Sequence, residues 1–167
     1  MTNEQWAART ANAPFVIAAV RSDEDLTVAR ELFRQYGTTP DVDVCVVGFA
    51  DEIEALPGPY AEPRGTILVA RVSGQPVGCV ALKPVGADVA EMKRLFVDPA
   101  CRGRKIGEGL TTAAIEAARG RGYSRLRLDS LPSMTAAQAI YRRAGFKDVA
   151  PWAATPVPGV SYLELTL

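Results

Sequence analysis

Histidine is absent from the 167-residue sequence, so the side chain most often used for proton transfer near neutral pH is missing. This absence excludes a Ser-His-Asp or Cys-His nucleophilic centre of the usual kind, and it excludes any metal site built on imidazole. Proton transfer must therefore fall to carboxylates, tyrosine, lysine, cysteine or water. We expect no metal ion in this protein.

Cysteine is scarce, and its three positions Cys45, Cys79 and Cys101 are widely spaced. Such a set supports neither a disulfide framework nor a zinc site. Cys45 and Cys79 have no evident activating neighbour, so the simplest interpretation is that the cysteines are buried as small apolar side chains.

Net charge is also missing, because 19 basic residues balance 19 acidic ones. No strong field draws the chain toward nucleic acid or an anionic membrane, and neither partner is expected. No apolar stretch approaches transmembrane length, and the N-terminus lacks the basic region and apolar run of a signal peptide. The cytoplasm is the expected location.

The order of the apolar patterns predicts one α/β domain over residues 15–167, preceded by a polar tail or short helical extension at 1–14. A strand, helix, strand succession in the second half predicts a parallel pair at the centre of a mixed, largely antiparallel sheet. The expected strands are 15–20, 66–72, 75–83, 89–97, 125–129, 146–149 and 160–167; the expected helices are 23–36, 51–56, 105–119 and 135–144; and 45–49 is left as strand or irregular structure.

The most informative stretch runs from residue 91 to residue 121 and predicts a buried strand, a tight glycine-bearing turn and an amphipathic helix. In the strand, Leu95 and Val97 face one side and Phe96 the other. The first N–H groups of the helix have no internal partner and its dipole favours negative charge, which suits a phosphate. The residues expected to form this anion site are Arg102, Gly103, Arg104, Lys105, Ile106 and Gly107.

Two properties of the turn favour a bound anion. Gly103, Gly107 and Gly109 lack the Cβ atom that would hold a ligand away from the backbone. Arg102, Arg104 and Lys105 add positive charge. An ordinary strand-to-helix turn with solvated basic residues is the alternative interpretation of the same segment.

The spacing of the turn resembles the acyl-CoA signature of the GNAT superfamily of N-acetyltransferases, Arg/Gln-x-x-Gly-x-Gly/Ala. Arg102 fills its first position and Gly107 its last, but Lys105 stands where the inner glycine is usual. The resemblance implies that this turn holds the pyrophosphate of acetyl-CoA. It also implies that the two central strands splay apart, so that the backbone of Leu95, Phe96 and Val97 pairs with the pantetheine amides.

A second segment, residues 139–146, is similar to the late GNAT signature, in which a helix bears a tyrosine and Gly-Phe follows four residues later. The resemblance makes Tyr141 the acid that protonates the departing CoA thiolate, whereas a core tyrosine is the alternative. An asparagine frequent in the family is replaced here by Met134. Ser130, Ser133 or Thr135 could take over its contact with the cofactor, and we include Ser130 in the expected cofactor site.

Glutamate on the central strand acts as general base in some members of the family, and Glu91 matches that position. It would take a proton from the substrate ammonium directly or through water, because only the uncharged amine can attack the thioester. Strand alternation predicts that Glu91 lies on the same side as Lys93, Leu95 and Val97. A surface ion pair between Glu91 and Lys93 is the alternative.

The resemblance therefore implies an enzyme that transfers an acetyl group from acetyl-CoA to a primary amine by direct attack in a ternary complex. A non-catalytic acyl-CoA-binding sensor or subunit is the alternative that the departures at Lys105 and Met134 leave open. An ATP-binding protein is not favoured, because the turn lacks Gly-Lys-Ser/Thr. Nothing in the sequence identifies the amine, and the final strand offers a surface for a homodimer.

Overall fold

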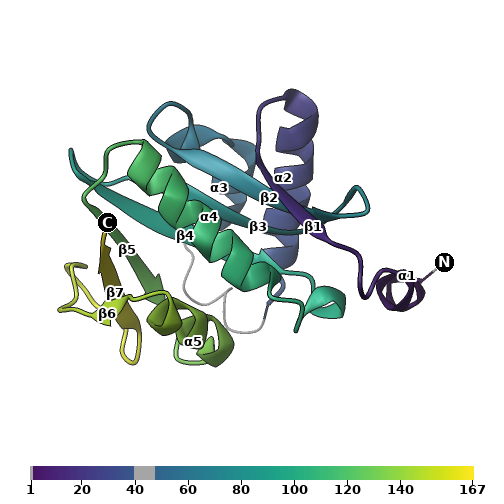
Figure 1. Ribbon diagram of the computed structural model, residues 1–167. Coiled ribbons are helices and arrows are strands. Elements are labelled where there is room, and N and C mark those ends of the chain that lie inside the picture. The colour runs from purple at the N-terminus through teal and green to yellow at the C-terminus, as the bar shows by residue number, and fades with distance from the viewer. Residues whose placement is uncertain (1, 40–47) are drawn as a thin grey trace.

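A seven-stranded sheet forms the centre of the computed structural model, which describes residues 2–39 and 48–167 (Figure 1). The spatial order is β1-β2-β3-β4-β5-β7-β6, and every neighbouring pair is antiparallel except β4 and β5, which are parallel. This arrangement confirms the predicted mixed sheet with one central parallel pair. The strands are β1 Phe15–Ala19, β2 Thr66–Val72, β3 Gln75–Pro84, β4 Val89–Val97, β5 Arg125–Ser130, β6 Lys147–Asp148 and β7 Ser161–Thr166.

Helices cover both faces of the sheet, with α4 in front of it and α2 and α3 behind it in Figure 1. The α-helices are α1 Asn3–Arg9, α2 Asp23–Gly37, α3 Phe49–Glu54, α4 Ile106–Gly120 and α5 Thr135–Arg143, and two short 3-10 turns are η1 Gly58–Tyr60 and η2 Pro99–Cys101. Of the two alternatives for residues 1–14, a polar tail or a short helical extension, the structure shows the helix, α1. Residues 40–47, which include most of the stretch 45–49, lie outside the described residues.

Two hydrophobic cores hold these layers together. The larger lies between the sheet and α4, where Leu110 and Ala114 are fully buried against side chains such as Leu126 of β5. The smaller lies between the opposite face of the sheet and α2 with α3, and it is centred on Phe33. Both helical faces follow from apolar spacing in the sequence, because residues three and four apart share one side of a helix.

The central parallel pair separates early. Pairing between β4 and β5 covers only Val89 to Glu91 on β4, although that strand continues to Val97 and β5 continues to Ser130. Beyond the last pair the two strands diverge, as the resemblance implied. Backbone groups on the inner edges of the diverging strands no longer pair with each other and can accept an extended ligand.

A β-bulge in β4 changes which side chains share a face. The register between β3 and β4 shifts between Cys79 and Ala81, and Arg94 has a positive φ of 59°. As a result Lys93 and Arg94 both project toward the face covered by α2, whereas Leu95 packs against the core under α4. The prediction that Glu91 and Lys93 share a side with Leu95 and Val97 was therefore wrong, because strict alternation assumes a regular strand.

Candidate functional site

A pocket of about 200 Å³ lies where β4 and β5 diverge. β4, β5 and α5 supply most of its wall, and α2 and the chain before and within β7 complete it. The lining residues are Tyr36, Met92, Lys93, Arg94, Leu95, Asp129, Ser130, Leu131, Met134, Tyr141, Val157, Val160 and Tyr162.

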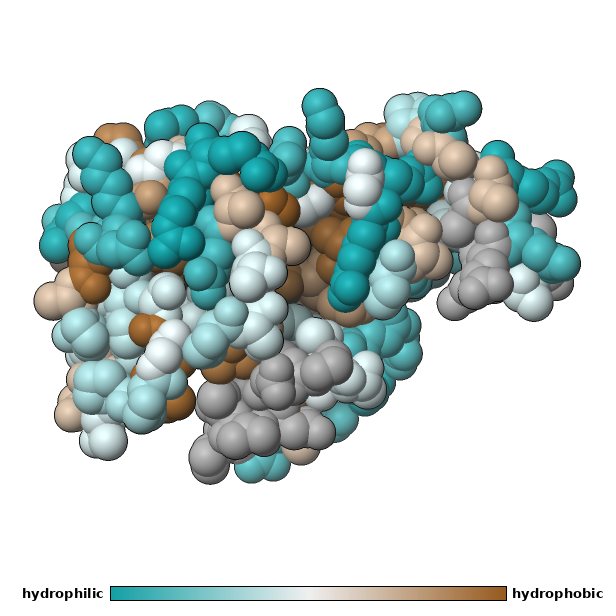
Figure 2. Space-filling model, turned by 90° about the horizontal axis from the view of Figure 1, so that it is seen from below, coloured by the Kyte–Doolittle hydropathy of each residue, from teal (hydrophilic) through white to brown (hydrophobic). Residues whose placement is uncertain are grey.

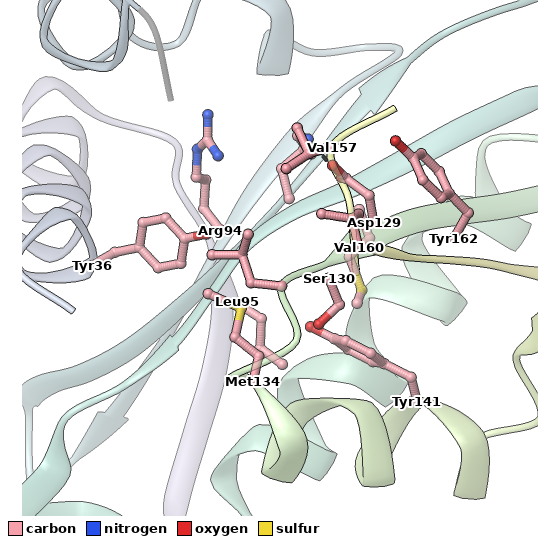
Figure 3. Close-up of a pocket in the computed structure, with 13 residues that line it drawn as sticks. Tyr36, Arg94, Leu95, Asp129, Ser130, Met134, Tyr141, Val157, Val160 and Tyr162 are labelled. Atoms are coloured by element: carbon pink, nitrogen blue, oxygen red, sulfur yellow. Dashed lines mark hydrogen bonds and ion pairs between the residues drawn. The ribbon is translucent and has the colours of Figure 1, made fainter. Parts of the chain in front are cut away.

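The pocket draws on side chains from both faces of the sheet (Figure 3). Tyr36 and Arg94 occupy one end, and Tyr141 and Met134 occupy the other. Two reactants that approach from opposite faces could therefore meet in the gap between the strands. Figure 2 shows the molecule from below, where hydrophobic residues (brown) are visible between projecting hydrophilic ones (teal).

Ser130, predicted from the loop after the fifth strand, lines this pocket and is only 4% exposed. Its Oγ is buried and has no hydrogen-bond partner among the described residues. A buried hydroxyl without a partner is unfavourable, and a ligand amide or carbonyl in the pocket would satisfy it. Leu95 also lines the pocket, whereas Val97 packs toward α4 and Phe96 enters the core behind the sheet.

The predicted anion turn precedes α4 and leaves the start of that helix without a side-chain cap. Lys105 occupies the N-cap position with φ 60°, and its side chain accepts no capping hydrogen bond from the first amides of the helix. Gly103 also has a positive φ of 77°, while Ile106 is 1% exposed and anchors the helix in the core. The amide groups at the start of α4 are therefore open to an external acceptor, as an anion site requires.

The three basic side chains of the turn have different surroundings. Arg102 and Lys105 are exposed. Arg104 instead turns toward the N-terminal segment, where its Nη2 donates hydrogen bonds of 2.8 Å to the carbonyl oxygens of Thr10 and Ala13. Arg104 thus connects the segment after α1 to the turn, and Arg102 and Lys105 are the predicted countercharges that face solvent.

Two glycines of α4 are required by packing between elements. A Cβ at Gly107 would lie 3.0 Å from Cδ1 of Ile140 on α5, and one at Gly109 would lie 2.7 Å from the ring of Phe15 on β1. These glycines therefore allow α4 to approach α5 and β1 closely. The sequence analysis attributed these glycines to room for a ligand at the backbone. In the structure, their missing Cβ atoms instead make room for the side chains of Ile140 and Phe15.

Replacing Lys105 by glycine tests the cost of its left-handed conformation. A left-handed residue with a Cβ costs about 1–2 kcal/mol, and the extra freedom of glycine in the unfolded chain offsets about 0.5–1 kcal/mol of that gain. We expect Lys105→Gly to raise the free energy of unfolding by up to about 1 kcal/mol and to weaken coenzyme A binding about two- to fivefold, because an exposed charge is lost. Chemical denaturation and calorimetric titration measure the two effects.

Lys105→Ala is the matched control for this substitution. It removes the same charge but keeps a Cβ in the left-handed region, so it should weaken binding equally and give no gain in stability. A Lys105→Gly variant that is less stable than the Lys105→Ala variant would contradict the interpretation.

Tyr141 projects from α5 into the pocket and packs against Phe146, with 5.9 Å between the ring centroids. Its side chain is buried, and burial raises the pKa of the phenol above its ordinary value of 10.0. The hydroxyl therefore stays protonated throughout the neutral range. That is the state that a proton donor needs.

Glu91 lies beside the pocket rather than on its wall. Its carboxylate is 7% exposed and forms ion pairs with Arg127 at 2.9 Å, Lys93 at 3.4 Å and Lys83 at 3.7 Å. The ion pair with Lys93 that the sequence offered as an alternative is present, but it belongs to a larger buried network. The role of Glu91 as a base stays a prediction.

Asp129 is the carboxylate on the pocket wall, and the sequence analysis missed it. It is the last residue but one of the alternating strand β5 and lies on the same face as Arg127, and its Oδ1 accepts a hydrogen bond of 2.9 Å from Nζ of Lys93. Burial alone would lower the pKa of Lys93, but the carboxylates of Asp129 and Glu91 raise it. Lys93 is therefore charged, and it connects the two carboxylates.

Arg94 was also missed, because the bulge that brings it to the pocket breaks the alternation on which strand interpretation depends. Tyr36 was missed because it lies on α2, far from β4 in the sequence. Glu52 of α3 accepts two hydrogen bonds from Arg94, from Nε at 3.0 Å and from Nη2. Burial alone would raise the pKa of Glu52, but the hydrogen bonds from Arg94 and Tyr60 lower it, so the pair is ionised.

Cysteine and metal chemistry find no support in the described part of the chain. Cys79 and Cys101 are buried as expected, and burial raises the pKa of both thiols. A thiol held in its neutral form is a poor nucleophile. Across residues 2–39 and 48–167, no cluster of three or more Cys, Asp or Glu side chains could hold a metal ion, and no helix is long and apolar enough to cross a membrane.

Comparison with known proteins places this chain in one family. The profile of the Acetyltransferase (GNAT) family matches residues 26–146. An uncharacterised N-acetyltransferase of Schizosaccharomyces pombe is 35% identical over 153 residues, which cover 90% of this chain and 94% of the relative.

Solved structures agree on the fold. The PaiA N-acetyltransferase of Thermoplasma acidophilum, in complex with coenzyme A, has a TM-score of 0.72 at 20% identity and covers 92% of this chain and 99% of its own. A GNAT-family acetyltransferase of Staphylococcus aureus has a TM-score of 0.76 at 16% identity, with 92% and 99% covered. The early separation of β4 and β5, the open start of α4 and the sequence match together identify this chain as a member of the GNAT family of acetyltransferases.

Proposed function

We propose that this protein is an N-acetyltransferase that moves an acetyl group from acetyl-CoA to the primary amine of a small molecule in a ternary complex. The single observation that carries the proposal is the pocket between the diverging strands, which reaches side chains on both faces of the sheet. Direct attack needs donor and acceptor to meet in one enclosed place. When bound, acetyl-CoA supplies the thioester carbonyl as acyl donor and the thiolate as leaving group.

The donor side of the site is formed by the turn before α4 and by the pocket end at Tyr141. The amides at Ile106 and Gly107, which the N-cap side chain does not cap, suit a pyrophosphate together with the exposed charges of Arg102 and Lys105. The buried Ser130 Oγ lacks a partner in the described chain and lies farther along the same gap, where a pantetheine amide would pass. These features support an extended CoA that runs from the turn before α4 to the pocket.

Proton transfers are assigned to two side chains that line the pocket. As the amine nitrogen forms its bond to the acyl carbon and the carbon–sulfur bond breaks, Tyr141 would give its proton to the departing thiolate. The surplus proton on the new amide nitrogen passes to solvent, and solvent returns a proton to Tyr141. Asp129 accepts the proton of the substrate ammonium. Glu91, which lies behind Lys93, acts on the acceptor only through water or through its effect on Lys93.

The first test measures cofactor binding and turnover separately. Acetyl-CoA at a hundred times its Kd should stabilise the fold by about 2.7 kcal/mol, whereas ATP at the same concentration should give no shift in Tm. Release of free thiol from acetyl-CoA with a panel of primary amines should then reveal turnover, and initial-rate plots should intersect as a ternary complex requires. Absence of stabilisation would refute the cofactor assignment.

The alternative of a CoA-binding module without turnover predicts a different pair of results. It rests on Lys105 and Met134, which depart from the usual family residues. Stabilisation by acetyl-CoA without thiol release from any amine in the panel would favour that alternative. Stabilisation with thiol release favours the enzyme.

A further inference from the structure

We call the end of the pocket at Tyr36 and Arg94 the acceptor end. Its arginine has a backbone conformation that is unusual for a strand residue. Arg94 has a φ of 59°, in a region that residues with a Cβ rarely adopt, and it lies at the register shift between β3 and β4. A regular strand would alternate the side chains of Lys93 and Arg94 between faces. Here both reach the α2 side of the sheet, so the bulge adds a second cation next to the pocket.

The guanidinium of Arg94 is fixed by contacts on several sides. Its side chain is 8% exposed, Glu52 holds Nε and Nη2, and Tyr60 donates a hydrogen bond of 2.7 Å to the same carboxylate. Its Cζ lies 5.6 Å from the ring centroid of Tyr36 and 4.8 Å from that of Phe49. An arginine held this firmly can present its remaining donors without loss of side-chain freedom.

Arg94 lines the pocket and has a guanidinium nitrogen left for a ligand carboxylate. The hydrogen bonds to Glu52 use Nε and Nη2, and no carboxylate of the described residues pairs with Nη1. The other polar side chain that interacts with Arg94 at this end of the pocket is the neutral phenol of Tyr36, which also lines the pocket. Lys93, by contrast, is already occupied by Asp129 and Glu91.

The charges around this end of the pocket do not balance. The ion pairs here contain four cations and three carboxylates, which leaves one net positive charge. The reactive form of an acceptor amine is neutral, so it does not compensate this charge. An acceptor that also carries one carboxylate would do so. The residues are the cations Lys83, Lys93, Arg94 and Arg127 and the carboxylates Glu52, Glu91 and Asp129.

We propose that the acceptor is a small amine that bears a carboxylate, and that Arg94 binds this carboxylate through Nη1 while the amine reaches toward Tyr141. The proposal rests on the proposed acetyltransferase function and specifies its substrate class. The cavity of about 200 Å³ suits a compact molecule. Arg94 and Tyr141 lie at opposite ends of it, so the carboxylate and the amine would be separated along the pocket.

A panel of matched amines tests the proposal by thiol release. Glycine, alanine, glutamate, β-alanine and 4-aminobutyrate are each compared with the same molecule in which a carboxamide replaces the carboxylate. We expect kcat/KM to be at least tenfold higher for the carboxylate of one or more pairs. Amidation lowers the pKa of a nearby amine and makes more of it reactive, so a preference for the carboxylate cannot arise from amine ionisation.

Substitution of Arg94 then tests whether this residue causes the preference for carboxylates. In an Arg94→Gln variant the KM of the preferred carboxylate should rise about ten- to a hundredfold, and the ratio of carboxylate to carboxamide kcat/KM should fall toward one. If the single variant is unstable, the double variant Glu52→Gln with Arg94→Gln is used, because it removes both charges of the buried pair. We expect the double variant to fold and to show the same fall in the ratio of carboxylate to carboxamide kcat/KM. Arg125→Gln, on the exposed start of β5, is the matched control and should keep the ratio.

The outcomes separate this proposal from the function on which it rests. Transfer to amines with no preference for carboxylates, or a preference that survives in the Arg94→Gln and double variants, overturns the carboxylate site and leaves the acetyltransferase standing. If the Arg94→Gln variant loses kcat/KM equally for the carboxylate and the carboxamide, Arg94 supports α3 structurally, and the carboxylate site is likewise overturned. Absence of thiol release with every amine refutes the proposed function, and the substrate class falls with it.

Discussion

Replacing Tyr141 by phenylalanine is expected to lower kcat about a hundredfold while the affinity for acetyl-CoA changes less than twofold. The substitution removes one oxygen from a side chain that lines the pocket and is 6% exposed. Phenylalanine keeps the packing against Phe146, so the fold should be retained. General acid catalysis contributes about 10²- to 10⁴-fold, and the proposed acid is then missing. Single-turnover kinetics and calorimetric titration separate the two quantities.

The pH dependence follows from the direction of the pKa shift of Tyr141. Burial raises the pKa of the phenol above 10.0, so the protonated acid persists to a higher pH than a free tyrosine would allow. Loss of activity from ionisation of Tyr141 should therefore begin only above pH 10. Between pH 6 and pH 9 the ratio of wild-type to variant kcat should stay constant. A ratio that falls across this interval would contradict the assignment.

Tyr123→Phe is the matched control. Tyr123 is also buried, at 4% exposed, but its hydroxyl is engaged with Arg64 away from the pocket. The hydroxyl accepts a hydrogen bond from Nε of Arg64 and donates one to the carbonyl oxygen of Arg64, and loss of these two hydrogen bonds should lower the free energy of unfolding by about 1–3 kcal/mol and leave kcat unchanged. If both variants lose activity in proportion to their stability, Tyr141 acts through packing alone.

The sequence predicts the scaffold well because local patterns determine it. Spacing of apolar residues is enough to place α4 between two strands, and a helical crossover between consecutive strands makes them parallel neighbours. The same patterns place Tyr141 on a helix near the end of the chain. Ser130 was included through the family resemblance, as a polar substitute for the asparagine that Met134 replaces, and the structure places it at the end of β5 rather than in the loop.

The acceptor end could not be predicted in this way. Arg94 reaches the pocket only because the backbone takes a left-handed conformation in the middle of β4, and no residue in the local sequence signals it. Tyr36 and Val160 come from distant parts of the chain, and only the folded sheet brings them together. Arg104 is a basic residue of the turn, but its hydrogen bonds to the N-terminal segment depend on where α1 ends.

The alternation of the fifth strand could have identified Asp129 as a site residue. In the strand sequence RLRLD the leucines face the core under α4, so Arg127 and Asp129 share the opposite face. Asp129 is the final member of that face, at the end of the strand that diverges from β4. A carboxylate at such a position is a better candidate for contact with a substrate than one in the paired part of the sheet, such as Glu91.

Replacing Asp129 by asparagine is expected to lower kcat/KM for the acceptor about a hundredfold at pH 6.5, and the deficit should shrink as the pH rises. At low pH most of the amine is protonated and needs a base, whereas at high pH solvent has already removed the proton. Asparagine keeps an oxygen that can accept the hydrogen bond from Lys93. Glu91→Gln should cost less than about tenfold at the same pH, because Glu91 lies off the pocket wall behind Lys93.

Asp88→Asn controls for the loss of a carboxylate near the central strands. Asp88 precedes β4, is 59% exposed and pairs with Arg125, so this variant should retain wild-type kcat/KM at every pH. Thermal denaturation of all three variants distinguishes a lost base from a damaged fold, since Glu91→Gln also weakens buried ion pairs with Arg127 and Lys93. A larger and more strongly pH-dependent loss for Glu91→Gln than for Asp129→Asn would reverse the assignment. Glu91, acting through an ordered water, would then be the base, because a carboxylate outside the pocket can reach an amine only through such a bridge.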